Sequence, residues 1–130
     1  MSQGNVSVVE DAYRTLTGDG LEAFADYWDD DIEWRAMRGR WRGRKAGVAY
    51  MREWLELFDD FSTEPIELID AGGQQVVLYL RYRGRARRSG IEVPPEYFAI
   101  VIDIRDDKIA RAREYATRAE ALEAVGLRER

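Results

Sequence analysis

One carboxylate in the sequence stands in a pattern that suits acid–base chemistry. Glu114 belongs to a predicted strand, and the other residues of its parity are Ala110, Ala112 and Ala116. The opposite parity holds Ile109, Arg111, Arg113 and Tyr115. Because side chains alternate between the faces of a strand, we expect the arginines to face solvent or a partner and the alanines to face inward. A lone inward carboxylate loses water, which raises its pKa and suits it to shuttle a proton or to anchor a ligand. The alternative is that Glu114 pairs with an arginine at the rim of the sheet.

A tyrosine and several apolar residues are candidates to complete a site around this carboxylate. Tyr13 lies on the apolar stripe of a predicted helix, and its hydroxyl could donate to a negative charge that develops on a ligand oxygen. The alternative is that Tyr13 is a packed core tyrosine with a satisfied hydroxyl. The helix and strand patterns place further side chains inward, as walls for a small apolar molecule: Trp34, Trp54, Leu80, Tyr82, Phe98, Ile100 and Ala112. For Trp34 and Trp54 the alternative is plain core packing.

The composition excludes several kinds of chemistry. The chain has 130 residues, with 20 basic and 25 acidic side chains, a formal net charge of −5, no cysteine and no histidine. Disulfides, thiolate metal sites, serine–histidine triads and histidine-ligated metals are therefore excluded. No glycine-rich nucleotide-binding motif follows a predicted strand. We expect chemistry without a cofactor or a metal, from Asp, Glu, Tyr, Lys or Arg with shifted pKa values.

Two charged runs have competing interpretations. Arg81, Arg83, Arg85 and Arg87 alternate along a strand, which could indicate nucleic-acid binding, but the chain is acidic and carries no recognition motif. We therefore expect a solvated or dimer-facing outer sheet and no nucleic-acid partner. The acidic residues 29–31 could suggest metal ligands, but consecutive side chains on a turn point in different directions, which favours a turn.

The elements that must position these residues follow from periodicity and from turn signals. Helices are predicted at 7–16, 21–28, 46–58 and 118–125, and strands at 32–37, 64–71, 76–87, 97–105 and 108–116. Ser7 with Glu10 and Thr117 with Glu120 have the spacing of capping boxes. Residues 38–44, rich in Arg and Gly, are predicted to form a loop. The pattern predicts one α+β domain over residues 1–130, with helices packed on one face of a curved sheet.

The sequence also gives expectations about location. No apolar run approaches the roughly 18–20 residues that a membrane helix needs, and the first residues lack the basic and apolar regions of a signal peptide. We therefore expect a soluble cytoplasmic protein with no membrane partner.

Several segments together resemble a known superfamily. They are residues 11–13 (DAY), 17–21 (TGDGL), 27–34 (YWDDDIEW), 41–44 (WRGR), 106–109 (DDKI) and 113–115 (REY). In this order they resemble the nuclear transport factor 2-like superfamily, in its SnoaL-like polyketide cyclase and ketosteroid isomerase-like branch. The resemblance implies a cone-shaped fold, in which helices on the concave side of a curved, mostly antiparallel sheet enclose a pocket.

The resemblance carries over to individual residues only in part. Tyr13 falls on the tyrosine that the isomerases of this group use, but Ala36 and Ile100 stand where those enzymes have an aspartate base and a protonated aspartate. Glu114 falls near an acid that the cyclases place on the last strand, although Ala112 and Arg113 replace the histidine and tryptophan before it. The absence of histidine excludes the histidine-dependent dehydratase chemistry of the group.

Two functions therefore remain open from the sequence. The first is a cofactor-free cyclase- or isomerase-type enzyme, in which Glu114 shuttles a proton and Tyr13 stabilises an oxyanion beside a small apolar substrate. The second is a non-catalytic ligand-binding or dimerisation module of the same fold. In either case we expect a homodimer formed through the outer face of the sheet.

Overall fold

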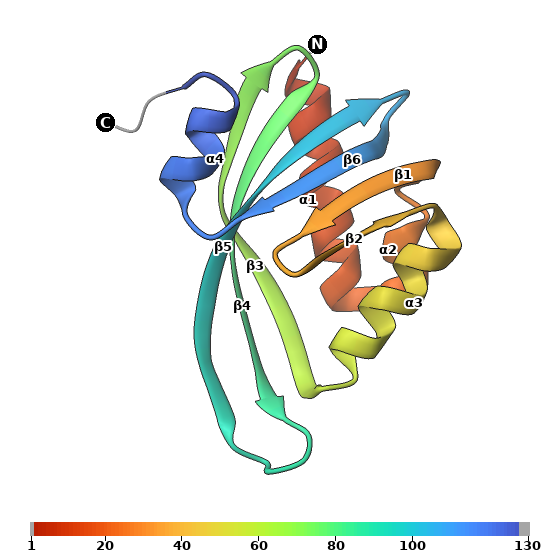
Figure 1. Cartoon of the computed structure of the whole chain (residues 1–130), viewed down its shortest axis with the longest axis vertical. Coiled ribbons are helices and arrows are strands. Elements are labelled where there is room, and N and C mark those ends of the chain that lie inside the picture. Colours follow the sequence, from red (N-terminus) through yellow and green to blue (C-terminus); the bar gives the residue numbers. More distant parts are fainter. Residues whose placement is uncertain (1, 128–130) are drawn as a thin grey trace.

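The computed structural model describes residues 2–127, which form a curved six-stranded sheet with helices packed against it (Figure 1). The helices are α1 (Ser2–Asp19), α2 (Leu21–Ala25), α3 (Arg44–Leu55) and α4 (Arg118–Ala124). The strands are β1 (Trp28–Ala36), β2 (Gly39–Arg42), β3 (Phe58–Gly72), β4 (Gln75–Ala86), β5 (Glu92–Arg105) and β6 (Lys108–Tyr115). This arrangement confirms the predicted α+β class with a curved, mostly antiparallel sheet.

The strand order places the first strand of the chain beside the last one. The sheet runs β2-β1-β6-β5-β4-β3, and its one parallel pair is β1 with β6. In that pair Trp34 lies opposite Ala112, although 78 positions separate them in the sequence. Antiparallel pairing on the other side of β6 places Glu114 opposite Ile100 of β5. The strand that carries the candidate carboxylate is therefore flanked by two strands that carry candidate wall residues.

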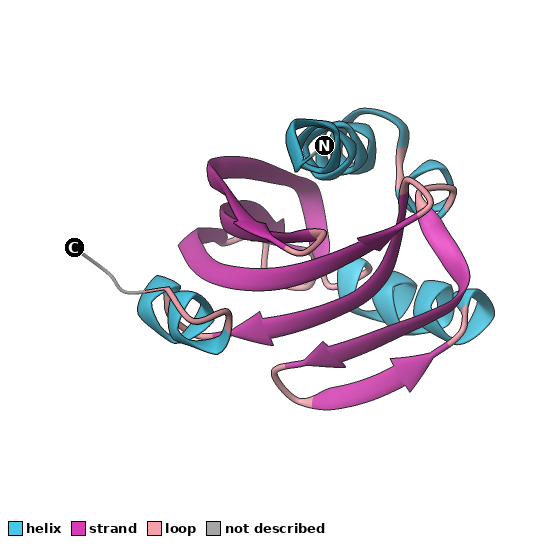
Figure 2. Ribbon diagram, turned by 90° about the horizontal axis from the view of Figure 1, so that it is seen from above, coloured by secondary structure: helices cyan, strands magenta, loops and turns pink. Residues whose placement is uncertain are grey.

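The helices divide between the two faces of the sheet. α1 packs across β3 and β4, and α3 packs against β1 and β2, over a core that includes Phe24, Trp28 and Leu78. The shorter α4 instead covers a second apolar cluster, in which Ala121 and Leu122 meet Val77, Ala99 and Val101. These strand residues alternate with the core residues Leu78 and Ile100, so α4 lies on the outer face, while Figure 2 shows the strands bending strongly. None of the helices in residues 2–127 is long and apolar enough to cross a membrane.

Several element boundaries differ from the prediction. α1 begins at Ser2 rather than at residue 7, because Val6 also packs on the core, so Ser7 lies inside the helix and does not cap it. The second helix ends at Ala25, and Trp28 is the first residue of β1. The predicted cap at the last helix is confirmed, since the Thr117 hydroxyl accepts from the backbone N–H of Glu120 at 3.1 Å.

A short strand replaces the predicted loop at residues 38–44. β2 pairs with β1 as a hairpin, and Trp41 lies opposite Trp34 with the two rings stacked at 5.2 Å. α3 crosses the Trp41 ring at Gly47, where an added Cβ would come within 2.2 Å of a ring carbon. A four-residue strand rich in Arg and Gly carries little periodic signal, and its inward tryptophan is what fixes it to the core.

A bulge changes the parity at the start of β6. Ile104 of β5 lies opposite Ile109, but Asp103 lies opposite Arg111, so Ala110 has no partner on β5. The extra residue turns Ile109 inward, where it is fully buried, and the prediction that it shares the outer face with the arginines is wrong. Ala110 is half-buried and Ala116 is exposed beyond the strand, so of the three alanines expected to face inward only Ala112 is fully buried.

Candidate functional site

The candidate site is built around Glu114 near the end of β6. Its carboxylate accepts one hydrogen bond from Trp34 Nε1 at 2.7 Å and another from the backbone N–H of Met37 at 3.2 Å. Both donors belong to β1 or to the turn that follows it, and the parallel pairing of β1 with β6 brings them to Glu114. No arginine in residues 2–127 forms an ion pair with Glu114. The alternative interpretation, that Glu114 pairs with an arginine at the rim of the sheet, is therefore not supported.

Burial without a counter-ion sets the acidity of this carboxyl group. Loss of water raises the pKa of Glu114 above its ordinary value, and the hydrogen bonds from Trp34 and from Met37 N–H lower it in part. The net shift is upward. A carboxyl group whose pKa is raised toward neutrality is suited to exchange a proton with a bound molecule.

Tyr13 is the second polar group of the site. Its side chain is only 4% exposed, and its hydroxyl has no hydrogen-bond partner among the described residues. Burial raises the pKa of Tyr13 well above its usual value, and the negative charge of Glu114 raises it further. The hydroxyl therefore stays protonated at neutral pH, as a donor with no acceptor of its own.

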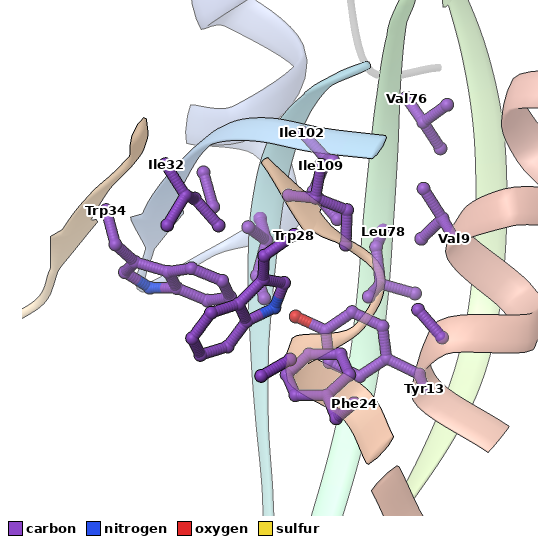
Figure 3. Close-up of a cluster of buried hydrophobic side chains, with 14 of the residues drawn as sticks. Val9, Tyr13, Phe24, Trp28, Ile32, Trp34, Val76, Leu78, Ile102 and Ile109 are labelled. Atoms are coloured by element: carbon purple, nitrogen blue, oxygen red, sulfur yellow. The ribbon is translucent and has the colours of Figure 1, made fainter. Parts of the chain in front are cut away.

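Two indole N–H groups share this condition. Trp28 Nε1 and Trp41 Nε1 are buried and have no acceptor within the described part of the chain. Their rings contact the Trp34 ring at 6.0 and 5.2 Å, and Figure 3 shows the Trp28 nitrogen pointing toward the Tyr13 oxygen. Buried polar groups are normally hydrogen-bonded, so these three donors are the polar atoms of the cluster beside Glu114 that lack a partner. Trp28 and Trp41 were not among the residues that the sequence marked as candidates for the site.

The family comparison agrees with this architecture. The family model of the SnoaL-like domain matches residues 9–112, which is most of the chain. The chain belongs to the SnoaL-like domain family. The match includes Tyr13, Trp28, Trp34 and Trp41, whereas Glu114 lies two residues beyond it. No protein in the curated collection matches the sequence significantly.

Solved structures with the same fold are numerous and distant in sequence. One is a protein from Jannaschia sp. described as a SnoaL-like polyketide cyclase, with a TM-score of 0.77, 15% identity, and coverage of 95% of this chain and 92% of that chain. Another is a nuclear transport factor 2-like protein of unknown function from Burkholderia pseudomallei, with a TM-score of 0.76, 17% identity, and coverage of 94% and 97%. A third is a protein from Catenulispora acidiphila with a ketosteroid isomerase-like fold in complex with trimethylamine, with a TM-score of 0.73, 16% identity, and coverage of 92% of each chain. These likenesses establish the fold, and the activity of this SnoaL-like domain has to be argued from its site.

The predicted wall residues fall into two groups in this SnoaL-like domain. Trp34 belongs to the indole cluster beside Glu114, whereas Trp54 and Tyr82 contact each other at 5.3 Å in a separate, half-buried aromatic cluster. That second cluster also holds Phe98, Phe58 and Phe61. Burial, and to a lesser extent the charges of Glu96 and Glu114, raises the pKa of Tyr82. The sequence did not assign Phe58 and Phe61 to the walls, because residue 58 was placed at the end of a predicted helix and residue 61 between two predicted elements, whereas both belong to β3.

The remaining predicted wall residues line the sheet beneath these rings. Leu80 and Ile100 are 1% exposed and Ala112 is fully buried. Leu80 lies opposite Phe98, and Ile102 lies opposite Ala112, so these residues share one face of three neighbouring strands. They are core residues that a ligand would meet only at the floor of a pocket.

One hollow of the structure lies on the other side of the same strands. It has a volume of about 530 Å³ over β2, β1 and β6, and its lining residues are Glu33, Trp34, Arg35, Arg40, Trp41, Arg42, Arg111, Ala112 and Arg113. This rim of arginines differs from the apolar pocket predicted inside the cone, which stays a prediction.

The acidic residues 29–31 lie within β1, so the prediction that they form a turn before the strand is wrong. The Asp29 carboxylate accepts from the backbone N–H of Asp31 at 3.0 Å and from Arg105 at 3.1 Å. The register of the pairing between β1 and β6 shifts between Trp28 and Glu33, so the acidic run forms a bulge or irregularity within β1. In residues 2–127 no group of acidic side chains is arranged to hold a metal ion.

Proposed function

We propose that this SnoaL-like domain is a cofactor-free enzyme of the cyclase or isomerase type that acts on a small, largely apolar carbonyl compound. Glu114 takes a proton from the carbon beside the carbonyl, and the C–H electron pair becomes the C=C bond of an enolate. The hydroxyl of Tyr13 donates a hydrogen bond to the enolate oxygen, and Glu114 returns the proton to the same or another carbon. No redox partner or cofactor is needed for this sequence of steps.

One observation carries the proposal, namely that the partly buried Glu114 carboxylate acts on a buried hydroxyl that has no acceptor. The Glu114 carboxylate is held by Trp34 and by Met37 N–H, and its charge acts on Tyr13. A fixed acid–base group beside a spare donor is the arrangement that proton transfer next to a carbonyl requires. The SnoaL-like family and the cyclase-like neighbours are compatible with such chemistry.

The test measures proton exchange rather than a named reaction. The protein is incubated in D₂O with 2-tetralone, a bicyclic ketone, and loss of the α-proton signal is followed by NMR above the solvent background. Glu114→Gln is expected to lower the protein-dependent rate by about 100-fold or more. Glu123→Gln, an exposed change of the same kind on α4, is the matched control and should leave the rate unchanged. An equal rate in Glu114→Gln and in the wild type contradicts the role of Glu114.

The second candidate is a non-catalytic ligand-binding module, and the dense packing of the interior favours it. Tyr13, Phe24 and Trp28 form a chain of edge-on contacts at 4.9 and 5.5 Å, which continues through Trp34 to Trp41. In addition, the resemblance to the isomerases assigns their two carboxylate positions to Ala36 and Ile100, neither of which is acidic. Saturable quenching of tryptophan fluorescence by 2-tetralone, without any exchange above background, would select this candidate.

We also propose that the protein is a homodimer that pairs through the outer face of its sheet. On that face Tyr79 stacks on Tyr97 at 5.9 Å, and 46% of Tyr97 is exposed. Exposed aromatic rings on a sheet are typical of contact surfaces. Size-exclusion chromatography with light scattering should give twice the 15.1 kDa chain mass, and the mass of one chain would contradict the dimer.

A further inference from the structure

Two neighbouring rows of side chains on the outer face differ sharply in charge. In the first row Arg42, Glu33, Arg111 and Asp103 lie opposite one another across four strands. Their charges alternate, with Arg42 bonded to Glu33 at 3.0 Å and Arg111 at 4.0 Å from Asp103. In the second row Arg40, Arg35 and Arg113 follow one another across β2, β1 and β6 with no acidic residue between them. Like charges directly opposite each other in a sheet are destabilising. The second row therefore lacks the acidic neighbours that neutralise the arginines of the first row.

The three arginines of the second row have no acidic partner. Among residues 2–127 none of them forms an ion pair. The Arg35 guanidinium lies over the Tyr115 ring at 5.2 Å, and Arg113 Nη1 contacts the Tyr115 hydroxyl at 3.5 Å. Arg113 Nε is buried and has no hydrogen-bond partner. One tyrosine therefore holds two guanidinium groups in place without neutralising either of them.

These side chains line the hollow of about 530 Å³ described above. Five arginines and one glutamate surround it, in a chain whose overall net charge is −5. Such a concentration of positive charge in a concave surface attracts anions, and a rigid guanidinium fork pairs well with phosphate oxygens.

We propose that this hollow binds the pyrophosphate group of a small molecule. Adjacent strands lie about 4.8 Å apart, so three guanidinium groups on three strands span roughly 10 Å. One phosphate is too small to contact groups across that width, whereas two linked phosphates present enough oxygens and negative charge to pair with all three. The arginines of the row lie on the face opposite Glu114, so this proposal does not rest on the proton-transfer function proposed above.

The experiment titrates the purified protein with inorganic pyrophosphate by calorimetry at constant ionic strength. We expect saturable binding of one pyrophosphate per chain, at least 10-fold tighter than binding of orthophosphate or sulfate. Arg40→Gln is expected to weaken pyrophosphate binding at least fivefold, since it removes one guanidinium from the row. Arg85→Gln, an exposed arginine of β4 that does not line the hollow, is the control and should change the affinity less than twofold.

The following results would overturn the proposal. The site is wrong if no saturable binding occurs, if sulfate binds as tightly as pyrophosphate, or if Arg85→Gln weakens binding as much as Arg40→Gln. A change of molecular mass in Arg40→Gln with unchanged pyrophosphate affinity would instead identify the row as a contact between protein chains. Because Arg40→Gln also relieves repulsion, its melting temperature without ligand should equal or exceed that of the wild type, which separates lost binding from lost folding.

If binding is found, two further ligands distinguish the sources of the pyrophosphate group. Tighter binding of uridine diphosphate than of isopentenyl diphosphate indicates a nucleotide, and the reverse order indicates an alkyl ester. Weaker binding of both than of free pyrophosphate would contradict a site for an esterified pyrophosphate.

Discussion

The two faces of β1 and β6 carry unneutralised charges of opposite sign. On the inner face Glu114 is a carboxylate among apolar residues, bonded to an indole and to a backbone N–H. On the outer face, one residue earlier, Arg113 belongs to a row of three arginines with no acidic partner. Neighbouring residues of opposite charge thus lie on opposite sides of the sheet, and neither neutralises the other.

This separation shows how strand alternation creates reactive groups. If Glu114 could reach Arg113, a salt bridge would lower the pKa of the carboxyl group, and the carboxylate would neutralise the charge of the guanidinium. The pleat prevents that contact because successive side chains point apart. Both the upward pKa shift of Glu114 and the unpaired row of arginines therefore follow from the same alternating sequence.

The largest expected effect comes from disturbing the inner face through its closest contact. Gly47→Ala would place a methyl group within 2.2 Å of the Trp41 ring, which stacks on Trp34. We expect it to lower the free energy of unfolding by roughly 3 kcal/mol or more, measured by urea denaturation. Gly18→Ala, which meets no atom within 4 Å, is the control and should be neutral or slightly stabilising. Equal stability of both variants would mean that α3 does not pack on Trp41 as described.

A smaller loss is expected when the carboxylate loses its indole donor. Trp34→Phe keeps an aromatic ring but removes the hydrogen bond to Glu114, so we expect a destabilisation of about 2 kcal/mol. Because that hydrogen bond lowers the pKa of Glu114, the pKa should rise further in the variant. A pH titration followed by ¹³C NMR of the Glu114 carboxyl group measures it. Trp54→Phe, whose ring lies in the other aromatic cluster, should leave this pKa in place, and a similar rise there would contradict the pairing.

Removing the spare hydroxyl should increase stability. Tyr13→Phe deletes a buried oxygen that has no partner, so we expect the free energy of unfolding to rise by about 1 kcal/mol. In the exchange assay the same change should slow proton transfer, since the enolate oxygen loses its donor. Tyr50→Phe, at an exposed position of α3, should change neither quantity. A loss of stability in Tyr13→Phe would show that the hydroxyl is hydrogen-bonded in solution.

The smallest effect is expected in the pH dependence of stability, because two hydrogen bonds offset part of the cost of burying Glu114. With its pKa raised on folding, the folded state binds the proton more tightly than the unfolded chain, where the value is about 4.5. The contribution of Glu114 to stability is therefore complete below pH 4.5 and is lost as the pH rises through the raised pKa. The glutamine of Glu114→Gln does not titrate, so the stability of this variant relative to the wild type should increase over that interval and then level off. Urea denaturation from pH 4 to 8 measures this, and a difference independent of pH would contradict the shift.

Much of the fold could be predicted because it is encoded locally. The long strands alternate and the last helix begins at Thr117, whose side chain caps it as the sequence indicates. The errors arise where a few residues depend on distant partners. β2 is held by the stacking of Trp41 on Trp34, and the bulge at Ala110 is visible only from the pairing of β6 with β5.

The candidate site shows the same limit. Alternation placed Glu114 on the inner face correctly, because the bulge precedes it and the parity from Ala112 onward is regular. Its partners Trp34 and Met37 could not be predicted, since they reach Glu114 through a parallel pair of strands that leaves no local mark in the sequence. The unpaired N–H groups of Trp28 and Trp41 likewise become apparent only when their surroundings are known.

The parallel pairing of β1 with β6 also affects how the molecule is made. During translation β1 leaves the ribosome long before residues 108–115, so until then one edge of β1 has no strand to bond with. Contacts between distant parts of a chain form slowly, and such an open edge can pair with other molecules. The nascent chain thus cannot assemble the Trp34–Glu114 hydrogen bond until residue 114 has been synthesised.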